Sequence, residues 1–244
     1  MDWEKGPDSE GRPDSEKSSG SEKDPGLKKS SGLKESIDLI KAPDLKKVLD
    51  LKKAPDLKKA LDLAGRTLSA RRFRHTLGVA SLAEDLARRH GLDPARARYA
   101  ALLHDLAKEI PEEQQVCLAK RWHLIRYPED ESCPSVLHGP LVSYWLAKCG
   151  LTDRELLAAI AHHTLGAPNM SRLEMLIYSA DLAEPGREFP QVDNLRQALY
   201  DSLEEGTLAC VEHTLHYLEE SHRPIHPLTR LTHEDLRRRH GFGT

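Results

Sequence analysis

The sequence of 244 residues is poor in several features that mark large classes of proteins. Only 5% of its residues are aromatic, and its four cysteines include no Cys-x-x-Cys pair. No stretch approaches the roughly 18 apolar residues of a membrane span, and the N-terminus has no apolar segment of a secretory signal. The sequence therefore excludes a disulfide framework and a zinc–thiolate site, and it predicts a cytoplasmic protein with reduced thiols.

An excess of positive charge is also missing. The chain has 36 basic residues (Lys and Arg) and 39 acidic residues (Asp and Glu), which gives a formal net charge of −3. A basic field that would attract nucleic acid is therefore absent. We expect a small-molecule partner, no nucleic acid and no membrane; a homodimer and an unidentified partner of the N-terminal tail are left open.

The composition changes abruptly near residue 65. Residues 1–64 hold 13 lysines, one arginine and no histidine, whereas residues 65–244 hold 3 lysines, 19 arginines and all 13 histidines. The first 35 residues offer almost nothing to bury, so we expect residues 1–64 to be a disordered tail. Residues 41–52 and 53–64 form a 12-residue repeat, which we interpret as a solvated linker with transient helix rather than as a docking helix.

From residue 65 onward, apolar residues recur at helical spacing and no period-2 run appears. The pattern predicts an all-α fold, with a single helical domain over residues 65–231 and a C-terminal tail over residues 232–244. Asp93 followed by Pro94 predicts a helix start, and capping boxes are expected at residues 152–155 and 171–174. Residues 127–135, rich in Pro, Asp, Glu and Ser, are expected to form a loop.

Several acidic and imidazole side chains fall on or beside apolar helix faces. His104 and Asp105 close an apolar helix, and Asp181 lies on the stripe that should face the core. A buried carboxylate is costly unless it is paired or bound to a metal. His75, His138 and the pair His162-His163 add imidazoles from other helices, and a helical bundle builds metal sites in this way. Imidazole with carboxylate suits iron, manganese, zinc or cobalt rather than calcium.

The order of these motifs resembles the HD-domain metal-dependent phosphohydrolases and, more narrowly, the bacterial YqeK family of symmetrical diadenosine tetraphosphate hydrolases. The segments that carry the resemblance are residues 72–79, 104–108, 138–140, 163–168 and 178–187. A His-Asp pair alone is a weak signal. The pattern Ala-Asp-x-x-Glu-Pro-x-Arg, together with the other segments in this order, is specific.

The resemblance implies a divalent metal, with iron as the first choice, manganese, cobalt or zinc as alternatives, and one or two ions. The implied ligands are His75, His104, Asp105 and Asp181. His138 and His163 complete a second metal position or hold the nucleotide's phosphates, and the sequence leaves both roles open. Of the adjacent histidines, the family pattern selects His163 because it precedes a threonine.

The resemblance also implies residues that act on the substrate. Asp105 and Lys108 are expected to be catalytic, because Asp105 can orient a water beside the metal and Lys108 can neutralise charge on phosphate oxygens. The implied nucleotide contacts are Lys108, Thr164, Arg187 and the segment His226, Pro227, Leu228 and Thr229.

The expected reaction is symmetrical cleavage of diadenosine tetraphosphate (Ap4A) to two ADP. Two alternatives remain open. The first is another nucleotide phosphohydrolase of the same superfamily, acting on deoxynucleoside triphosphates or nucleoside monophosphates. The second is a nucleotide-binding sensor that holds its ligand without turnover.

Overall fold

The computed structural model describes residues 56–239, which lie within one compact unit, Lys41–Thr244. These residues form eleven α-helices and one short 3-10 helix without a β-strand, so the predicted all-α class is confirmed. None of the helices in this part of the chain is long and apolar enough to cross a membrane. The elements are α3 (Leu57–Thr67), α4 (Ala70–Arg89), α5 (Pro94–Leu103), α6 (Glu112–Arg121), α7 (Glu129–Ser132), η1 (Pro134–Val136), α8 (His138–Lys148), α9 (Arg154–His162), α10 (Arg172–Ala183), α11 (Val192–Asp201), α12 (Leu203–Glu220) and α13 (Pro227–Arg239).

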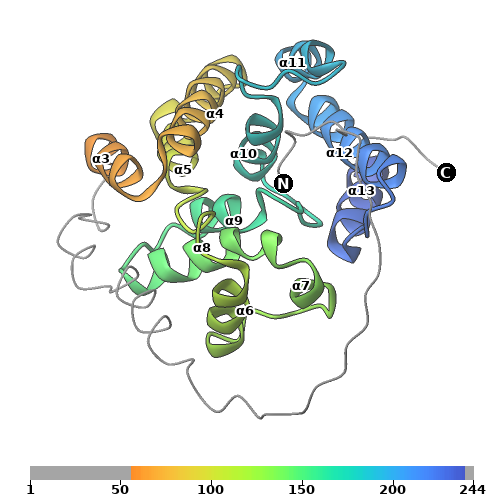
Figure 1. The fold of residues 1–244 in the computed structure, drawn as a ribbon. Coiled ribbons are helices and arrows are strands. Elements are labelled where there is room, and N and C mark those ends of the chain that lie inside the picture. The colour runs from red at the N-terminus through yellow and green to blue at the C-terminus, as the bar shows by residue number, and fades with distance from the viewer. Residues whose placement is uncertain (1–55, 240–244) are drawn as a thin grey trace, which may run out of the picture. The chain divides into compact units, whose positions relative to one another are not determined.

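Helix α10 forms the centre of the bundle. Ten of its twelve residues are buried, among them Leu176, Ile177 and Ala180 with no exposed surface. A helix that is apolar on all sides must be covered on all sides, and α10 packs against α4, α9 and α12 (Figure 1). This central position places Asp181, in the last turn of α10, among the surrounding helix ends.

Two of three predicted helix starts occur where expected. Asp93 caps α5 by accepting from the amides of residues 95 and 96, and Ser171 with Glu174 forms the predicted capping box of α10. The capping box expected at residues 152–155 is wrong, because Asp153 rather than Thr152 caps α9. Asp153 is held in place by the Arg96 guanidinium, 2.6 Å from its carboxylate.

Helix α3 corrects the predicted boundary between tail and domain. It begins at Leu57, inside the second repeat copy, and packs against α5 and α4. Its buried residues Ala60, Leu63 and Ala64 face the domain, and Asp56 caps its first turn. The expectation of disorder is therefore wrong for residues 57–64, because three small or apolar residues at helical spacing are enough to cover an edge of the bundle. The rest of the predicted tail, residues 1–55, lies outside the described residues.

The C-terminal boundary is corrected in the same way. Helix α13 runs through the predicted end of the domain at residue 231, and Thr232 and Leu236 have no exposed surface. Asp235 anchors α13 by accepting the Asn169 amide at 2.7 Å. The sequence carries no clear signal for this helix because three of its four buried positions are polar. Residues 240–244 lie outside the described part, and the loop expected over residues 127–135 contains α7 and part of η1.

Candidate metal centre

Five helices supply the predicted ligands, most of them at helix ends. His75 lies in α4, His104 follows the last residue of α5, and His138 begins α8. His163 follows the last residue of α9, and Asp181 lies in the last turn of α10. The structure therefore brings together side chains that are up to about a hundred residues apart in the sequence.

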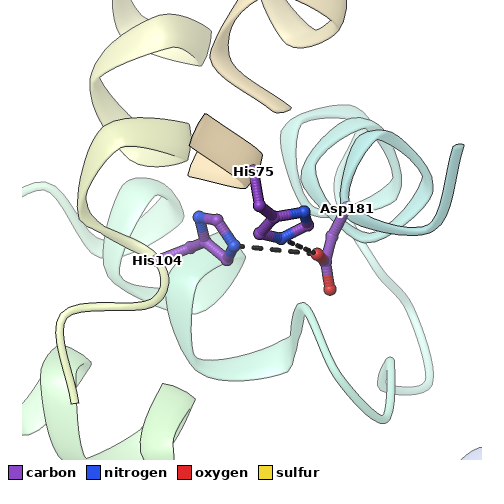
Figure 2. Close-up of side chains that lie close together, drawn as sticks. All are labelled: His75, His104 and Asp181. Carbon is purple, nitrogen blue, oxygen red and sulfur yellow. Dashed lines mark ion pairs between the residues drawn. The ribbon is translucent and has the colours of Figure 1, made fainter. Parts of the chain in front are cut away.

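The first cluster consists of His75, His104 and Asp181 (Figure 2). Asp181 Oδ1 lies 2.9 Å from His75 Nε2 and 3.7 Å from His104 Nε2. The Asp181 side chain is 23% exposed, so the expectation that it faces the core is only partly correct. Its position gives the first cluster an opening toward solvent.

The second cluster consists of Asp105, His138 and His163. Asp105 Oδ1 lies 3.1 Å from His138 Nε2 and 3.7 Å from His163 Nε2. Its other oxygen, Oδ2, lies 3.4 Å from His104 Nε2 and 3.7 Å from His75 Nε2. Asp105 is therefore shared by the two clusters.

Hydrogen bonds to the far side of each ring fix which nitrogen faces the site. Main-chain carbonyls three residues earlier accept from Nδ1 of His104, His138 and His163 at 2.6–2.7 Å. Two of these carbonyls belong to the last turns of α5 and α9, where the helix leaves them without a main-chain donor. Since a carbonyl only accepts, each Nδ1 carries the proton in the neutral ring, and each Nε2 presents a lone pair to the site.

The Nε2 atoms fit a cation. Those of His75 and His104 are buried and have no hydrogen-bond partner. Those of His138 and His163 lie 2.8 Å apart, so two lone pairs face each other beside the Asp105 carboxylate unless a proton or a metal ion intervenes. Burial and the Lys108 charge hold the pKa of His138 well below its usual range, which disfavours a proton there. The donor set of four imidazoles and two carboxylates therefore suits a divalent transition metal.

The charges of the first cluster also favour a bound metal ion. Burial alone would lower the pKa of His104, but the adjacent Asp105 and Asp181 carboxylates raise it to about 10. Burial alone would raise the pKa of Asp105, yet His104 and the hydrogen-bonded histidines keep it well below its usual range. A site that holds a proton on His104 so strongly provides the negative charge that attracts a metal ion in its place.

Cationic side chains border the clusters. Arg187 Nη2 lies 3.7 Å from Asp181 Oδ1, and its buried Nε has no hydrogen-bond partner. Lys108 is close enough for its charge to act on His138, and Thr164 Oγ1 lies 3.5 Å from His138 Nε2. Sequence reasoning missed Arg72, which donates to Asp105 Oδ2 at 3.1 Å. The sequence did contain a signal for Arg72, because Arg72 precedes His75 by three residues on one helix and therefore lies on the same face.

A glycine allows the close approach of α8 and α9. A Cβ at Gly139 would lie 2.8 Å from the Ile160 carbonyl oxygen and 3.1 Å from the His163 ring. Any larger residue next to His138 would therefore force the two helix ends apart. The Gly that follows the histidine in the sequence thus explains how His138 and His163 come within 2.8 Å.

His162 and His226 do not face the two clusters. His162 donates from Nδ1 to Glu174 at 2.7 Å, away from the second cluster. His226 uses both ring nitrogens, since Nδ1 accepts the Leu228 amide and Nε2 donates to Asp130. The structure therefore does not place His226 among the metal-facing residues, and it leaves Pro227 and Leu228 partly exposed and Thr229 buried at the start of α13.

A cavity of about 250 Å³ is lined by residues close in sequence to the second cluster, but by no residue of either cluster. Its lining includes Leu137 and His162, the neighbours of His138 and His163 in the sequence, and Leu228 from α13. Tyr127 and Tyr144 also line it, although the chain has few aromatic residues. Trp122 stacks on Tyr144 with ring centroids 4.9 Å apart.

Comparisons with known proteins show the family of the chain. The HD domain model matches residues 72–186. A symmetrical bis(5'-nucleosyl)-tetraphosphatase of Bacillus subtilis is 35% identical over 170 residues, covering 69% of this chain and 91% of the relative. The chain belongs to this HD-domain family. A second member, the protein of the same name from Halalkalibacterium halodurans, is 34% identical and 90% covered.

A solved structure supports the family fold. It is described as a predicted HD superfamily hydrolase involved in NAD metabolism from Clostridium acetobutylicum. It is 35% identical to this chain, with a TM-score of 0.71, and the match covers 75% of this chain and 97% of the other. The matched HD segment contains every residue of the two clusters, whereas α3, α11, α12 and α13 lie outside it.

Proposed function

We propose that this protein is a metal-dependent hydrolase that cleaves bis(5'-nucleosyl)-tetraphosphates symmetrically, converting Ap4A to two ADP. The observation that carries the proposal is the convergence of four histidine Nε2 atoms on Asp105 and Asp181, with Arg187 and Lys108 beside them. This is the donor set of a metal ion next to the charges that a polyphosphate requires. Relatives of the same family, covered almost over their full length, carry this activity in their names.

The residues divide into ligands and substrate contacts. We assign His75, His104, Asp105 and Asp181 as ligands of one divalent ion, and Asp105, His138 and His163 as a second position that a further ion or a phosphate group occupies. When bound, the ion would supply positive charge and lower the pKa of a water toward about 7. Iron is our first choice, with manganese, cobalt or zinc as alternatives.

The side chains around the clusters perform the remaining steps. Asp105 orients the attacking water toward one of the two central phosphorus atoms. The bond from that phosphorus to the central bridging oxygen then breaks, and the oxygen leaves with the second ADP. Lys108 and Thr164 contact the phosphate oxygens as charge moves onto them, and Arg187 donates its free Nε–H to a phosphate group. Arg72, 3.1 Å from Asp105 Oδ2, orients this carboxylate.

The aromatic-lined cavity supports a place for a nucleoside. Tyr127 and Tyr144 offer ring faces for a base, and Leu228 adds an apolar contact. The start of α13, from His226 to Thr229, contacts the nucleotide in this proposal, with His226 holding the segment to Asp130 rather than touching phosphate. The four cysteines, which form no disulfide in the described part of the chain, support a cytoplasmic location.

Product analysis tests this function. Metal-loaded protein incubated with Ap4A should release ADP as the single nucleotide product, and elemental analysis of anaerobically purified protein should show iron. Release of ATP with AMP would reject symmetrical cleavage. Turnover of deoxynucleoside triphosphates or nucleoside monophosphates, without ADP formation from Ap4A, would favour another phosphohydrolase of the superfamily. Tight binding of Ap4A without any product would identify a sensor.

A further inference from the structure

We propose that Glu184 is a positioning residue of the metal centre, one that orients His75 and strengthens it as a ligand. This inference rests on the metal role proposed for His75. Glu184 Oε1 accepts the Nδ1–H of His75 at 3.2 Å, while Nε2 of the same ring faces Asp181. A carboxylate behind a ligating imidazole fixes its tautomer and raises its basicity. The other three histidines of the two clusters have neutral main-chain carbonyls in this place.

The Glu184 carboxylate is itself held by the turn that follows α10. Its side chain is 6% exposed, and Oε2 accepts the Gly186 amide at 2.6 Å. Arg196 of α11 donates to the carbonyl oxygens of Ala183 and Glu184, both at 2.8 Å. These carbonyls close the helix that carries Asp181, and the Glu184 carbonyl also accepts the Arg187 amide at 2.9 Å. The turn therefore fixes the carboxylate relative to the ligand on α10.

Gly78 provides the space for this carboxylate. It lies three residues after His75 on α4, so both face the same side of the helix. A Cβ at Gly78 would overlap Glu184 Oε2 and lie 3.2 Å from Glu184 Cδ. Glycine is a poor helix former, yet it occupies an interior position of a 20-residue helix. Any side chain here would displace the carboxylate from the His75 ring.

The experiment measures metal binding directly. Apo-protein is titrated with Co²⁺ in competition with a chelator, and the visible absorption band of bound Co²⁺ reports the ligand field. Glu184→Gln keeps the shape but removes the charge, and we expect it to weaken Co²⁺ affinity by about 10–100-fold with a shifted band. Gly78→Ala, which leaves every ligand and the carboxylate in the chain, should act in the same direction.

Gly65→Ala is the matched control. It is the same substitution in a helix, but its Cβ meets only the Phe73 ring at 3.4 Å, an ordinary contact, and α3 carries no ligand. It should bind Co²⁺ as the wild type does. Alanine favours helix over glycine, so a loss of affinity in Gly78→Ala does not come from a weakened α4.

The outcomes separate this inference from the proposed function. Wild-type Co²⁺ affinity and an unchanged band in Glu184→Gln would overturn the role of Glu184, while ADP formation by the wild-type protein would leave the proposed function standing. If Glu184→Gln does not fold, the affinity of Gly78→Ala decides in the same way. A wild-type protein that binds no Co²⁺ would overturn both the inference and the proposed metal centre.

Discussion

The two clusters that share Asp105 differ in charge and in access to solvent. The first cluster has a carboxylate of its own, Asp181, and a second one, Glu184, behind His75. In the second cluster His138 and His163 are 1% and 2% exposed, and among residues 56–239 Asp105 is the carboxylate recorded against them. A divalent ion loses hydration when it binds to a protein, and negatively charged ligands must compensate for that cost. We therefore expect the first cluster to hold its ion without substrate, and the second to depend on Asp105 and on the incoming phosphate.

Removing the charge of Asp181 should have the largest effect. Asp181→Asn keeps the shape of the side chain but replaces a carboxylate with an amide, a far poorer ligand for a transition metal. We expect a folded, metal-poor variant whose kcat/KM falls by more than about 100-fold, since even residues behind the ligands contribute about 10–100-fold. Elemental analysis and ADP formation measure the two effects. Full metal content with near-normal turnover would show that Asp181 is a structural carboxylate. The proposed difference in charge between the two clusters would then be wrong.

The adjacent histidines should differ because they face different surroundings. His163→Ala removes a lone pair from the second cluster, and we expect kcat to fall by about 10–100-fold while the ion in the first cluster remains. His162→Ala removes a contact with Glu174 and should change kcat little. Steady-state kinetics on both variants, together with metal analysis, makes the test. A larger loss in His162→Ala would show that the cavity, rather than the second cluster, governs turnover.

Chelation should reveal the first cluster through stability. A metal ion stabilises the folded state that binds it, so the melting temperature of the wild-type protein should fall by several degrees on chelation, in line with the usual size of such linkage. Asp181→Asn should barely respond, because it holds little metal. His163→Ala should respond nearly as the wild type does. Equal responses of all three proteins would show that the chelated ion lies elsewhere.

The smallest effect on either cluster should come from α3. Leu63→Ala opens a gap under this helix and should lower the free energy of unfolding by about 2 kcal/mol. A chain that begins at Gly65 loses most of α3 and should be less stable than one that begins at Asp56. Denaturant unfolding and Co²⁺ titration separate stability from metal binding, and we expect metal affinity to remain unchanged in every case. A change in Co²⁺ affinity would show that α3 influences the first cluster.

The sequence predicted the helical class, and its motifs predicted which residues meet. Local signals sufficed where the structure depends on near neighbours, as at the Asp93 cap and the Ser171 capping box. They failed at both ends of the domain. α3 is amphipathic but lies in the lysine-rich repeat that was interpreted as a linker, and α13 buries Thr229, Thr232 and Asp235, so it carries no clear apolar stripe.

The surroundings of the ligands could not be predicted in the same way. Arg72 and Asp105 are 33 residues apart, and His75 and Glu184 are 109 residues apart. A charged residue at a helix end commonly pairs with a neighbour in sequence, and Arg187 Nε does lie 3.9 Å from Glu184 Oε1. Only the packing of α4 against α10 shows that Glu184 lies behind a ligand and that Gly78 leaves room for it.

The sequence by itself determined that the chain is helical, that His75, His104, Asp105 and Asp181 are the ligand candidates, and that they belong to one order of motifs. The helical class follows from helix spacing, and the cost of a charged group on an apolar face marked Asp181; both arguments are local. The choice of these four ligands came from the resemblance of the motif order to the HD-domain family. The tertiary structure decided which ring nitrogen faces the site, because that depends on carbonyls at helix ends and on Glu184 from another helix. It also decided that Asp105 joins two clusters, because helices α4, α5, α8, α9 and α10 converge there only once α10 is buried among them.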